Sequence, residues 1–180
     1  MAERQDTRTE EELLVLKAQD GSKHAFAVLY KSYHPSLLRF SYGICKNEQM
    51  AADAVQDAWI TIMRTLHNLY ETSMFRARVF KAVRWRTLDL LRKQPSGHVP
   101  FDEQAEQIAA VTSSPDATKG QLIWHIKQLP EGEQQAVYLF YLEELKLSEI
   151  AAVLEVPTGT VKSRLNRARA RLREQMTTED

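Results

Sequence analysis

The stretch EIAAVLEVPTGTVKSRLNRARARLRE, from Glu149 to Glu174, decides the fold of the C-terminal part of this chain. It places a short apolar helix, a Pro-Thr-Gly break and a strongly basic helix one after another. In the second helix, apolar residues recur at spacings of four, three and four and so share one buried stripe: Val161, Leu165, Ala168 and Leu172. This order is typical of a helix-turn-helix, which presents its second helix to the major groove of DNA.

The remaining surface of that second helix is basic. Its six cations precede the first acid, Glu174, and at about 100° per residue they fall on two flanks. One flank holds Lys162, Arg169 and Arg173, and the other holds Arg164, Arg167 and Arg171. Two basic flanks suit a helix in a groove, because phosphates line both walls. We expect Thr158 to cap the helix, the first-turn N–H groups to bind a phosphate, and Ser163 and Asn166 to reach base edges.

A basic helix can also be a solvated surface that only keeps the chain soluble. The preceding helix weighs against this alternative, because Ile150, Ala151 and Leu154 form an apolar face with a small residue where two helices approach closely. Glu155 departs from the expected pattern. The turn after this helix favours a left-handed residue, and a Glu in that conformation costs about 1 kcal/mol.

Composition describes a soluble globular chain of one or two small domains, with 180 residues, 43% apolar, 27% charged and a formal net charge of zero. The charge is segregated: residues 76–93 hold seven basic residues against Asp89, whereas residues 94–118 hold four acids and no Lys or Arg. No stretch predicts membrane insertion, and the charged N-terminus does not resemble a secretory signal. The lone Cys45 excludes an internal disulfide and favours a reducing cytoplasm, with the thiol buried as a small apolar group.

Helical periodicity and chain breakers predict an all-α protein of two small helical domains joined by a flexible acidic linker. Periodicity runs through residues 10–93 with three interruptions, which indicates four helices. A Pro- and Gly-rich segment then separates it from a second helical unit. The expected interruptions are near residues 20–22, 46–48 and 68–73, and the expected divisions are residues 1–93, the linker 94–117 and residues 118–180.

Two helices of the first domain carry candidate binding residues. In residues 49–66, apolar residues form the core side and leave Asp53, Gln56 and Asp57 together on the outer face. Acids in the first half of a helix also complement its dipole, so this patch is either a binding surface or simple stabilisation. The apolar side comprises Ala51, Ala54, Val55, Ala58, Trp59, Ile62 and Leu66.

The helix predicted over residues 74–93 has a buried side and a second, basic face. The buried side holds Val79, Val83, Thr87 and Leu90, and the basic face holds Arg78, Lys81, Trp85 and Arg92. An aromatic ring among cations is a natural surface for unstacked bases. The alternative is that Trp85 packs against a neighbouring helix or the linker. The loop before this helix, residues 68–73, has the polar and aromatic groups that a pocket for an extruded base uses.

The chain resembles bacterial sigma factors of the extracytoplasmic-function (ECF) type, the minimal members that keep only the second and fourth sigma domains. The resemblance covers nearly the whole chain, and the P-x-GTVKSR core followed by RAR is highly specific to the fourth domain. Four segments carry it: FAVLYKSYHPSLLRFSYGI from Phe26, DAVQDAWITIM from Asp53, FRARVFKAVRWRTLDLLRK from Phe75, and LPEGEQQAVYLFYLEELKLSEIAAVLEVPTGTVKSRLNRARARL from Leu129.

This resemblance implies a role for each candidate residue. It implies contact with the coiled-coil clamp helices of core RNA polymerase by Asp53, Gln56 and Asp57. It implies that the helix from Phe75 to Lys93 melts and reads the single-stranded −10 promoter element, with Asp89 and Arg92 at family-typical positions. The basic face of this helix adds Arg78, Lys81 and Trp85 as candidate contacts. It implies recognition of the duplex −35 element by Thr158, Thr160, Lys162, Ser163, Arg164 and Arg167. The linker resembles the family's connector, which runs through the polymerase toward the RNA path.

Three positions depart from the family pattern, and two of them bear on promoter preference. Family members usually carry Trp where this chain has Arg78, and Asn where it has Trp85. The change to Trp85 favours stacking on bases while removing a specific polar contact. Residues 134–136 also lack an Arg that is common near there.

We therefore expect a promoter-specificity subunit that binds core RNA polymerase and promoter DNA and is held inactive by an anti-sigma factor. No catalytic constellation, cofactor motif or metal-ligand cluster stands out, and the five histidines are scattered, so we expect no enzyme activity, cofactor, metal or small-molecule substrate. One alternative is a stand-alone helix-turn-helix regulator that binds an operator as a dimer through residues 118–176. Another is an adaptor that sequesters a protein through its N-terminal helices.

Overall fold

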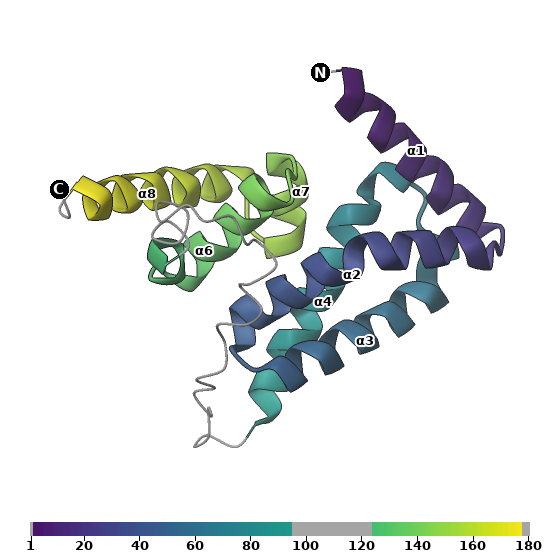
Figure 1. The fold of residues 1–180 in the computed structure, drawn as a ribbon, viewed down its shortest axis with the longest axis horizontal. Coiled ribbons are helices and arrows are strands. Elements are labelled where there is room, and N and C mark those ends of the chain that lie inside the picture. Colours follow the sequence, from purple (N-terminus) through teal and green to yellow (C-terminus); the bar gives the residue numbers. More distant parts are fainter. Residues whose placement is uncertain (1, 95–123, 178–180) are drawn as a thin grey trace, which may run out of the picture. The chain divides into compact units, whose positions relative to one another are not determined.

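The computed structural model describes residues 2–94 and 124–177, with side chains over residues 9–94 and 124–175. Over these ranges all regular secondary structure is helical, and the helices form two units, α1 to α4 and α6 to α8 (Figure 1). The all-α prediction is therefore confirmed. The predicted linker, residues 94–117, lies outside the described residues except for its first position, and the exact domain limits stay predictions.

The N-terminal unit holds four α-helices that break where the sequence predicts. They are α1 (Ala2–Gln19), α2 (Lys23–Cys45), α3 (Glu48–Thr65) and α4 (Phe75–Lys93), with short helices η1 (Leu66–Asn68) and η2 (Thr72–Met74) between the last two. Side-chain caps set two of the starts. The Ser22 hydroxyl accepts from the Ala25 amide at 3.2 Å, and the Asn47 side chain accepts from the Met50 amide at 2.8 Å.

The core of this unit lies where α3 packs against α2 and α4. The predicted apolar side is confirmed, since its six residues on α3 and Leu66 of η1 are all buried. On α4, Val79, Val83 and Thr87 are buried as predicted, whereas Leu90 is only partly buried. Cys45 is buried and free, and its burial raises the pKa of the thiol. Helix α1 packs against α2. Arg76 of α4 links all three helices, because its Nε donates to the Tyr33 hydroxyl of α2 at 2.8 Å and lies 3.5 Å from Glu11 Oε2 of α1.

The C-terminal unit is built around the predicted helix-turn-helix. It comprises helical residues 124–127, α6 (Glu131–Val137), a π-helical turn η4 (Tyr138–Leu142), α7 (Leu147–Leu154) and α8 (Thr158–Thr177). Helix α8 packs against both α6 and α7. Its stripe is buried at Val161, Leu165 and Ala168, but Leu172 is only partly covered. On α7, Ile150 and Leu154 are buried as expected, and Val153 rather than the half-exposed Ala151 completes the face.

Backbone geometry at the turn between α7 and α8 confirms one prediction and corrects another. Glu155 adopts the left-handed conformation, with φ 55° and ψ 46°, and the Val156 amide bonds the Ala151 carbonyl at 3.1 Å. Thr158 is not the N-cap. Helix α8 already begins there, because the Pro157 carbonyl accepts from the Thr160 and Val161 amides at 2.9 and 3.2 Å. The cap position therefore falls on Pro157, whose ring suits a helix start.

Candidate protein and nucleic-acid interfaces

The polar patch on α3 lies on the side opposite its buried stripe. Asp53 and Gln56 are exposed, and Gln49 Nε2 donates to Asp53 Oδ1 at 3.0 Å from one turn earlier. Asp57 differs from them because its carboxylate is ion-paired with Arg86 of α4, whose Nη2 lies 2.6 Å from Oδ2. The three predicted contacts thus share a face, and Asp57 differs from the other two because it is tied to α4.

Arg86 was not predicted as a functional residue, yet it joins α3 to α4. Its Nε donates to Asp57 Oδ2 at 2.7 Å and its Nη1 to Asp89 Oδ2 at 2.7 Å, while Lys93 Nζ donates to the same Asp89 oxygen at 2.9 Å. The hydrogen bond from Lys93, helped by the charge of Arg86, lowers the pKa of the Asp89 carboxyl. The hydrogen bond to Asp57 raises the pKa of the Arg86 guanidinium. The i,i+3 spacing of Arg86 and Asp89 was the available sequence signal.

The basic face of α4 is smaller than predicted. Lys81 and Arg92 are exposed, and the Trp85 side chain is 57% exposed, so this ring is not buried against another described helix. Arg78 is half-buried instead, and its Nη2 donates to the Thr65 carbonyl at the end of α3 at 3.0 Å. Helical periodicity placed Arg78 beside Lys81 and Trp85 but could not show that the end of α3 covers this position. Tyr70, in the loop between η1 and η2, is fully exposed.

Both basic flanks of α8 contact other residues of the same unit, although the arginines that make these contacts remain exposed. On one flank, Arg167 Nε donates to Glu133 Oε1 of α6 at 3.2 Å and Arg171 Nε lies 3.3 Å from Oε2. On the other, Arg169 Nε donates to the Tyr141 hydroxyl at 2.7 Å, and its guanidinium lies over the Phe140 and Tyr141 rings. Periodicity assigns residues to a flank but cannot show which helix covers it.

Exposed side chains remain on the first turns of α8, at the end predicted to enter a groove. Thr158, Lys162 and Ser163 are exposed, and the Ser163 hydroxyl donates to the Thr160 carbonyl at 2.9 Å. Arg164 is half-buried, and its guanidinium packs 3.0 to 3.3 Å from where a side chain on Gly132 would begin. The predicted contacts on α8 are therefore divided between its two flanks, with Thr160 and Arg164 partly covered and the others more accessible.

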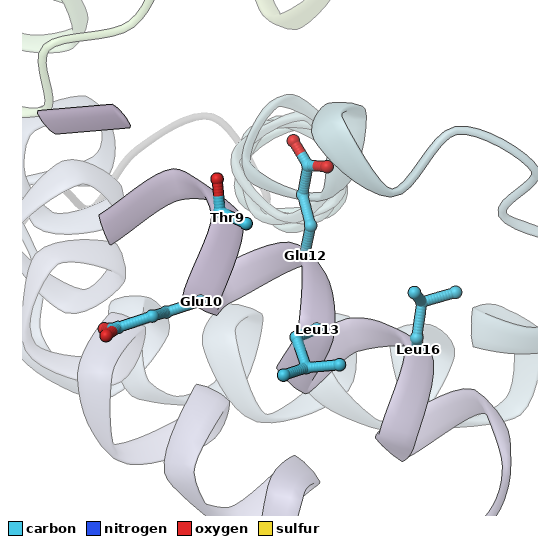
Figure 2. Close-up of a pocket in the computed structure, with 5 residues that line it drawn as sticks. All are labelled: Thr9, Glu10, Glu12, Leu13 and Leu16. Carbon is cyan, nitrogen blue, oxygen red and sulfur yellow. The ribbon is translucent and has the colours of Figure 1, made fainter. Parts of the chain in front are cut away.

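A shallow pocket lies on α1. It is lined by Thr9, Glu10, Glu12, Leu13 and Leu16. Figure 2 shows that these side chains leave one helix in different directions, so no group of them converges on a ligand. The described residues also contain no cluster of three or more His, Cys, Asp or Glu that could hold a metal ion. No helix among them has the length and apolar character needed to cross a membrane.

Two family models match the two units in order. The model for Sigma-70 region 2 matches residues 29–96, and the model for Sigma-70 region 4 matches residues 126–172. The first match begins within α2 and runs through α4, and the second runs through α6 and α7 to Leu172, near the end of α8. Together these helices carry every residue that the sequence predicted as a binding contact.

Curated relatives match over almost their full length. The chain is 29% identical to the RNA polymerase sigma-H factor of Pseudomonas aeruginosa, over 91% of this chain and 92% of that protein. It is 26% identical to the ECF RNA polymerase sigma factor SigW of Bacillus subtilis, over 90% of this chain and 94% of that protein.

Solved structures share the fold. CnrH in complex with the cytosolic domain of CnrY matches with a TM-score of 0.68 and 22% identity, over 94% of this chain and 99% of that one. The sigma factor RpoE in complex with the anti-sigma factor NepR from Bartonella quintana matches with a TM-score of 0.63 and 20% identity, over 86% and 98%.

A helical unit with sigma region 2 followed by a helix-turn-helix unit with sigma region 4 defines a two-domain transcription initiation factor. The chain belongs to the RNA polymerase sigma factors, and its relatives place it among those of the ECF type. Members of this family are initiation factors rather than enzymes. Family membership therefore favours the initiation factor over the stand-alone helix-turn-helix regulator.

Proposed function

We propose that this sigma factor binds core RNA polymerase through the outer face of α3. Asp53 and Gln56 are exposed there, on the side opposite the buried apolar stripe, where a partner helix can reach them. Asp57 contributes from the same face while its ion pair with Arg86 fixes its position. In this role the patch binds a partner protein, and the stabilisation of α3 by acids near its N-terminus is a lesser effect.

Helix α4 is proposed to take the single-stranded −10 element. The 57% exposed Trp85 ring offers a stacking surface, and Lys81 and Arg92 supply exposed cations on the same helix. Arg78 and Asp89 are proposed to act differently from the sequence expectation, because each is tied to groups of the chain itself. Arg78 contacts the end of α3 directly, and Asp89 contacts α3 through Arg86, so both hold α4 against α3. They contact DNA only through atoms that these bonds leave accessible.

Helix α8 is proposed to read the duplex −35 element in the major groove. Lys162 and Ser163 are exposed in its first turns, where a recognition helix meets base edges. Arg167 keeps 58% of its side chain exposed while its Nε is bound to Glu133, so its remaining N–H groups can reach DNA. Thr158 and Thr160 in the first turn and the half-buried Arg164 complete the proposed set of contacts.

The polymerase supplies the phosphodiester chemistry in this proposal, and the sigma factor contributes binding energy without catalysis of its own. We also propose that the protein acts in the cytoplasm under control of an anti-sigma factor. The fold matches two sigma factors solved in complex with other proteins, CnrH with CnrY and RpoE with the anti-sigma factor NepR. Such a partner would cover surfaces on α3, α4 or α8 that are otherwise available to polymerase and promoter.

One observation supports the proposal most directly: a region 2 unit with an exposed polar face is followed in the chain by a region 4 unit with an exposed, basic recognition helix. Runoff transcription with purified core polymerase tests it, on DNA upstream of the protein's own gene. We expect specific transcripts that are lost with Asp53→Ala combined with Gln56→Ala. The matched control, Asp20→Ala, removes an exposed carboxylate outside α3 and should leave transcription unchanged.

The same assay separates the alternatives. A stand-alone regulator would bind duplex DNA tightly without polymerase and yield no transcript on any template. An adaptor would tolerate Lys162→Ala, whereas the proposed sigma factor should lose transcription from promoters that depend on a −35 element. Transcripts that persist at wild-type levels with both the α3 pair and Lys162 replaced would overturn the proposal.

A further inference from the structure

Glu133 is a buried carboxylate that faces the basic recognition helix. It lies in the first turn of α6, and only 7% of its side chain is exposed. Its Oε1 accepts a hydrogen bond from Arg167 Nε at 3.2 Å. Its Oε2 is buried without a hydrogen bond but lies 3.3 Å from Arg171 Nε, which makes an ion pair. One buried charge therefore holds two cations of α8.

The buried carboxylate of Glu133 lowers the stability of the fold unless a cation pairs with it. Burying an ionised carboxylate is unfavourable without a paired cation, and an apolar residue at such a position is often neutral or stabilising. The neighbours of Glu133 on the covered side of α6 include the buried Ala136 and Val137, so the site would accept an apolar residue. Arg164 packs over Gly132 in the same turn, so three arginines of one flank lie along α6.

The pairing changes what these arginines offer to DNA. A cation that neutralises a phosphate releases counterions, and each such contact steepens the salt dependence of binding by about 0.9 in log–log slope. A cation already compensated by a buried carboxylate releases fewer counterions and is held in one place. Arg167 and Arg171 remain 58% and 52% exposed, so the pairing restrains them without hiding them.

We propose that Glu133 is a specificity-determining positioning residue for promoter recognition. By holding Arg167 and Arg171 along α6 it limits their sequence-independent attraction to phosphates, so that discrimination by α8 depends on base contacts. The inference rests on the proposed contact of α8 with DNA. Without Glu133, the two arginines would move onto phosphates, and binding to any duplex would strengthen while discrimination fell.

The test is the salt dependence of binding by the full chain to a duplex of random sequence, measured by fluorescence anisotropy. We expect Glu133→Gln to steepen the slope by up to about 1.8, because two cations become available. The matched control is Glu131→Gln, which makes the same change in net charge at an exposed position of the same helical turn. A general effect of net charge would change the slope equally in both variants. The proposed restraint predicts a clearly larger change of slope for Glu133→Gln than for Glu131→Gln.

Lys162→Ala separates failure of this inference from failure of the proposed function. Lys162 is exposed, and its loss should reduce the slope by about 0.9 if α8 contacts DNA. No change with Lys162→Ala would overturn the proposed DNA contact. A reduced slope with Lys162→Ala, together with equal slopes for the two Glu variants, would overturn the role of Glu133 alone.

A second variant keeps the inference testable if Glu133→Gln fails to fold by circular dichroism. In the otherwise wild-type chain, Arg171→Ala should leave the slope unchanged because Glu133 already restrains this cation. A reduction as large as that of Lys162→Ala would show that Arg171 contacts phosphate freely and would overturn the proposal.

Discussion

Replacing Thr87 by Val should destabilise the N-terminal unit more than replacing Ser41 by Ala, and the double replacement should recover most of the loss. Both hydroxyls are fully buried between α2 and α4, with the two oxygens 2.7 Å apart. The Thr87 hydroxyl also lies 2.8 Å from the Val83 carbonyl, which can only accept. The single Thr87 proton is therefore used on Val83, and Ser41 must be the donor between the two side chains.

The expected magnitudes follow from which groups lose a partner. Val has nearly the volume of Thr, so Thr87→Val opens no cavity. The buried Ser41 hydroxyl loses its oxygen acceptor and keeps only the weak acceptor Cys45 Sγ, at a cost of about 1–3 kcal/mol. Ser41→Ala removes the donor while Thr87 still bonds Val83, which should cost about 0.5–1.5 kcal/mol. With both hydroxyls replaced, no polar group is stranded. The double variant should therefore lie near the wild type, with a coupling energy close to the sum of the two single losses, about 1.5–4.5 kcal/mol.

Hydrogen exchange of α2 and α4 amides in the full chain provides the free energies, because it reports the N-terminal unit separately from the C-terminal unit. Losses that simply add in the double variant would refute the reasoning, as would a Thr87→Val loss no larger than that of Ser41→Ala. Since α4 carries Trp85 and Lys81, the single Thr87 variant should also lower the temperature at which runoff transcription is lost. The double variant should restore that temperature.

Three further outcomes are expected. Glu155→Gly should stabilise the C-terminal unit by about 0.5–1 kcal/mol in hydrogen exchange, because relief of about 1–2 kcal/mol of left-handed strain outweighs the greater freedom of unfolded Gly. The control Glu155→Ala removes the same side chain but keeps the strain. An equal gain in stability from Glu155→Ala would contradict the reasoning. Trp85→Ala should weaken holoenzyme binding to a single-stranded −10 oligonucleotide by about 1–3 kcal/mol per stacked base, with Trp85→Phe largely retaining it. Lys93→Met should raise the lowered pKa of the Asp89 carboxyl toward its usual value in an NMR titration, and an unchanged pKa would show that Lys93 is not the main cause. A lowered folded pKa stabilises the fold above the unfolded pKa of about 4, and this stabilisation is lost as the pH falls through the folded value.

Elements dictated by local pattern could be predicted from the sequence. The apolar repeat of α3 predicts its buried side because a helix turns at a constant angle. The left-handed Glu155 follows from the short break between α7 and α8, whatever residue occupies the turn. Thr158 was assigned wrongly as the cap because Thr is a favoured capping residue, whereas the helix starts from the Pro157 carbonyl.

Pairings between distant residues could not be read from periodicity. Arg86 and Asp57 are 29 residues apart, and Arg167 and Glu133 are 34 residues apart. Each pair depends on how two helices are packed, and a helical projection shows only the direction in which each side chain leaves its own helix. For the same reason Arg78 was predicted to be exposed, although the end of α3 supplies a carbonyl that binds it.

The contacts of the arginines bear on how this protein would find promoters. Its formal net charge is zero, and Arg86, Arg167 and Arg171 are paired with its own carboxylates. Sequence-independent affinity for DNA comes almost entirely from cations that neutralise phosphates. A chain that compensates several of its arginines internally should therefore bind random DNA weakly by itself, with a shallow salt dependence. Productive promoter binding then requires the additional DNA contacts of the polymerase, which would keep this subunit from occupying DNA without the enzyme that it directs.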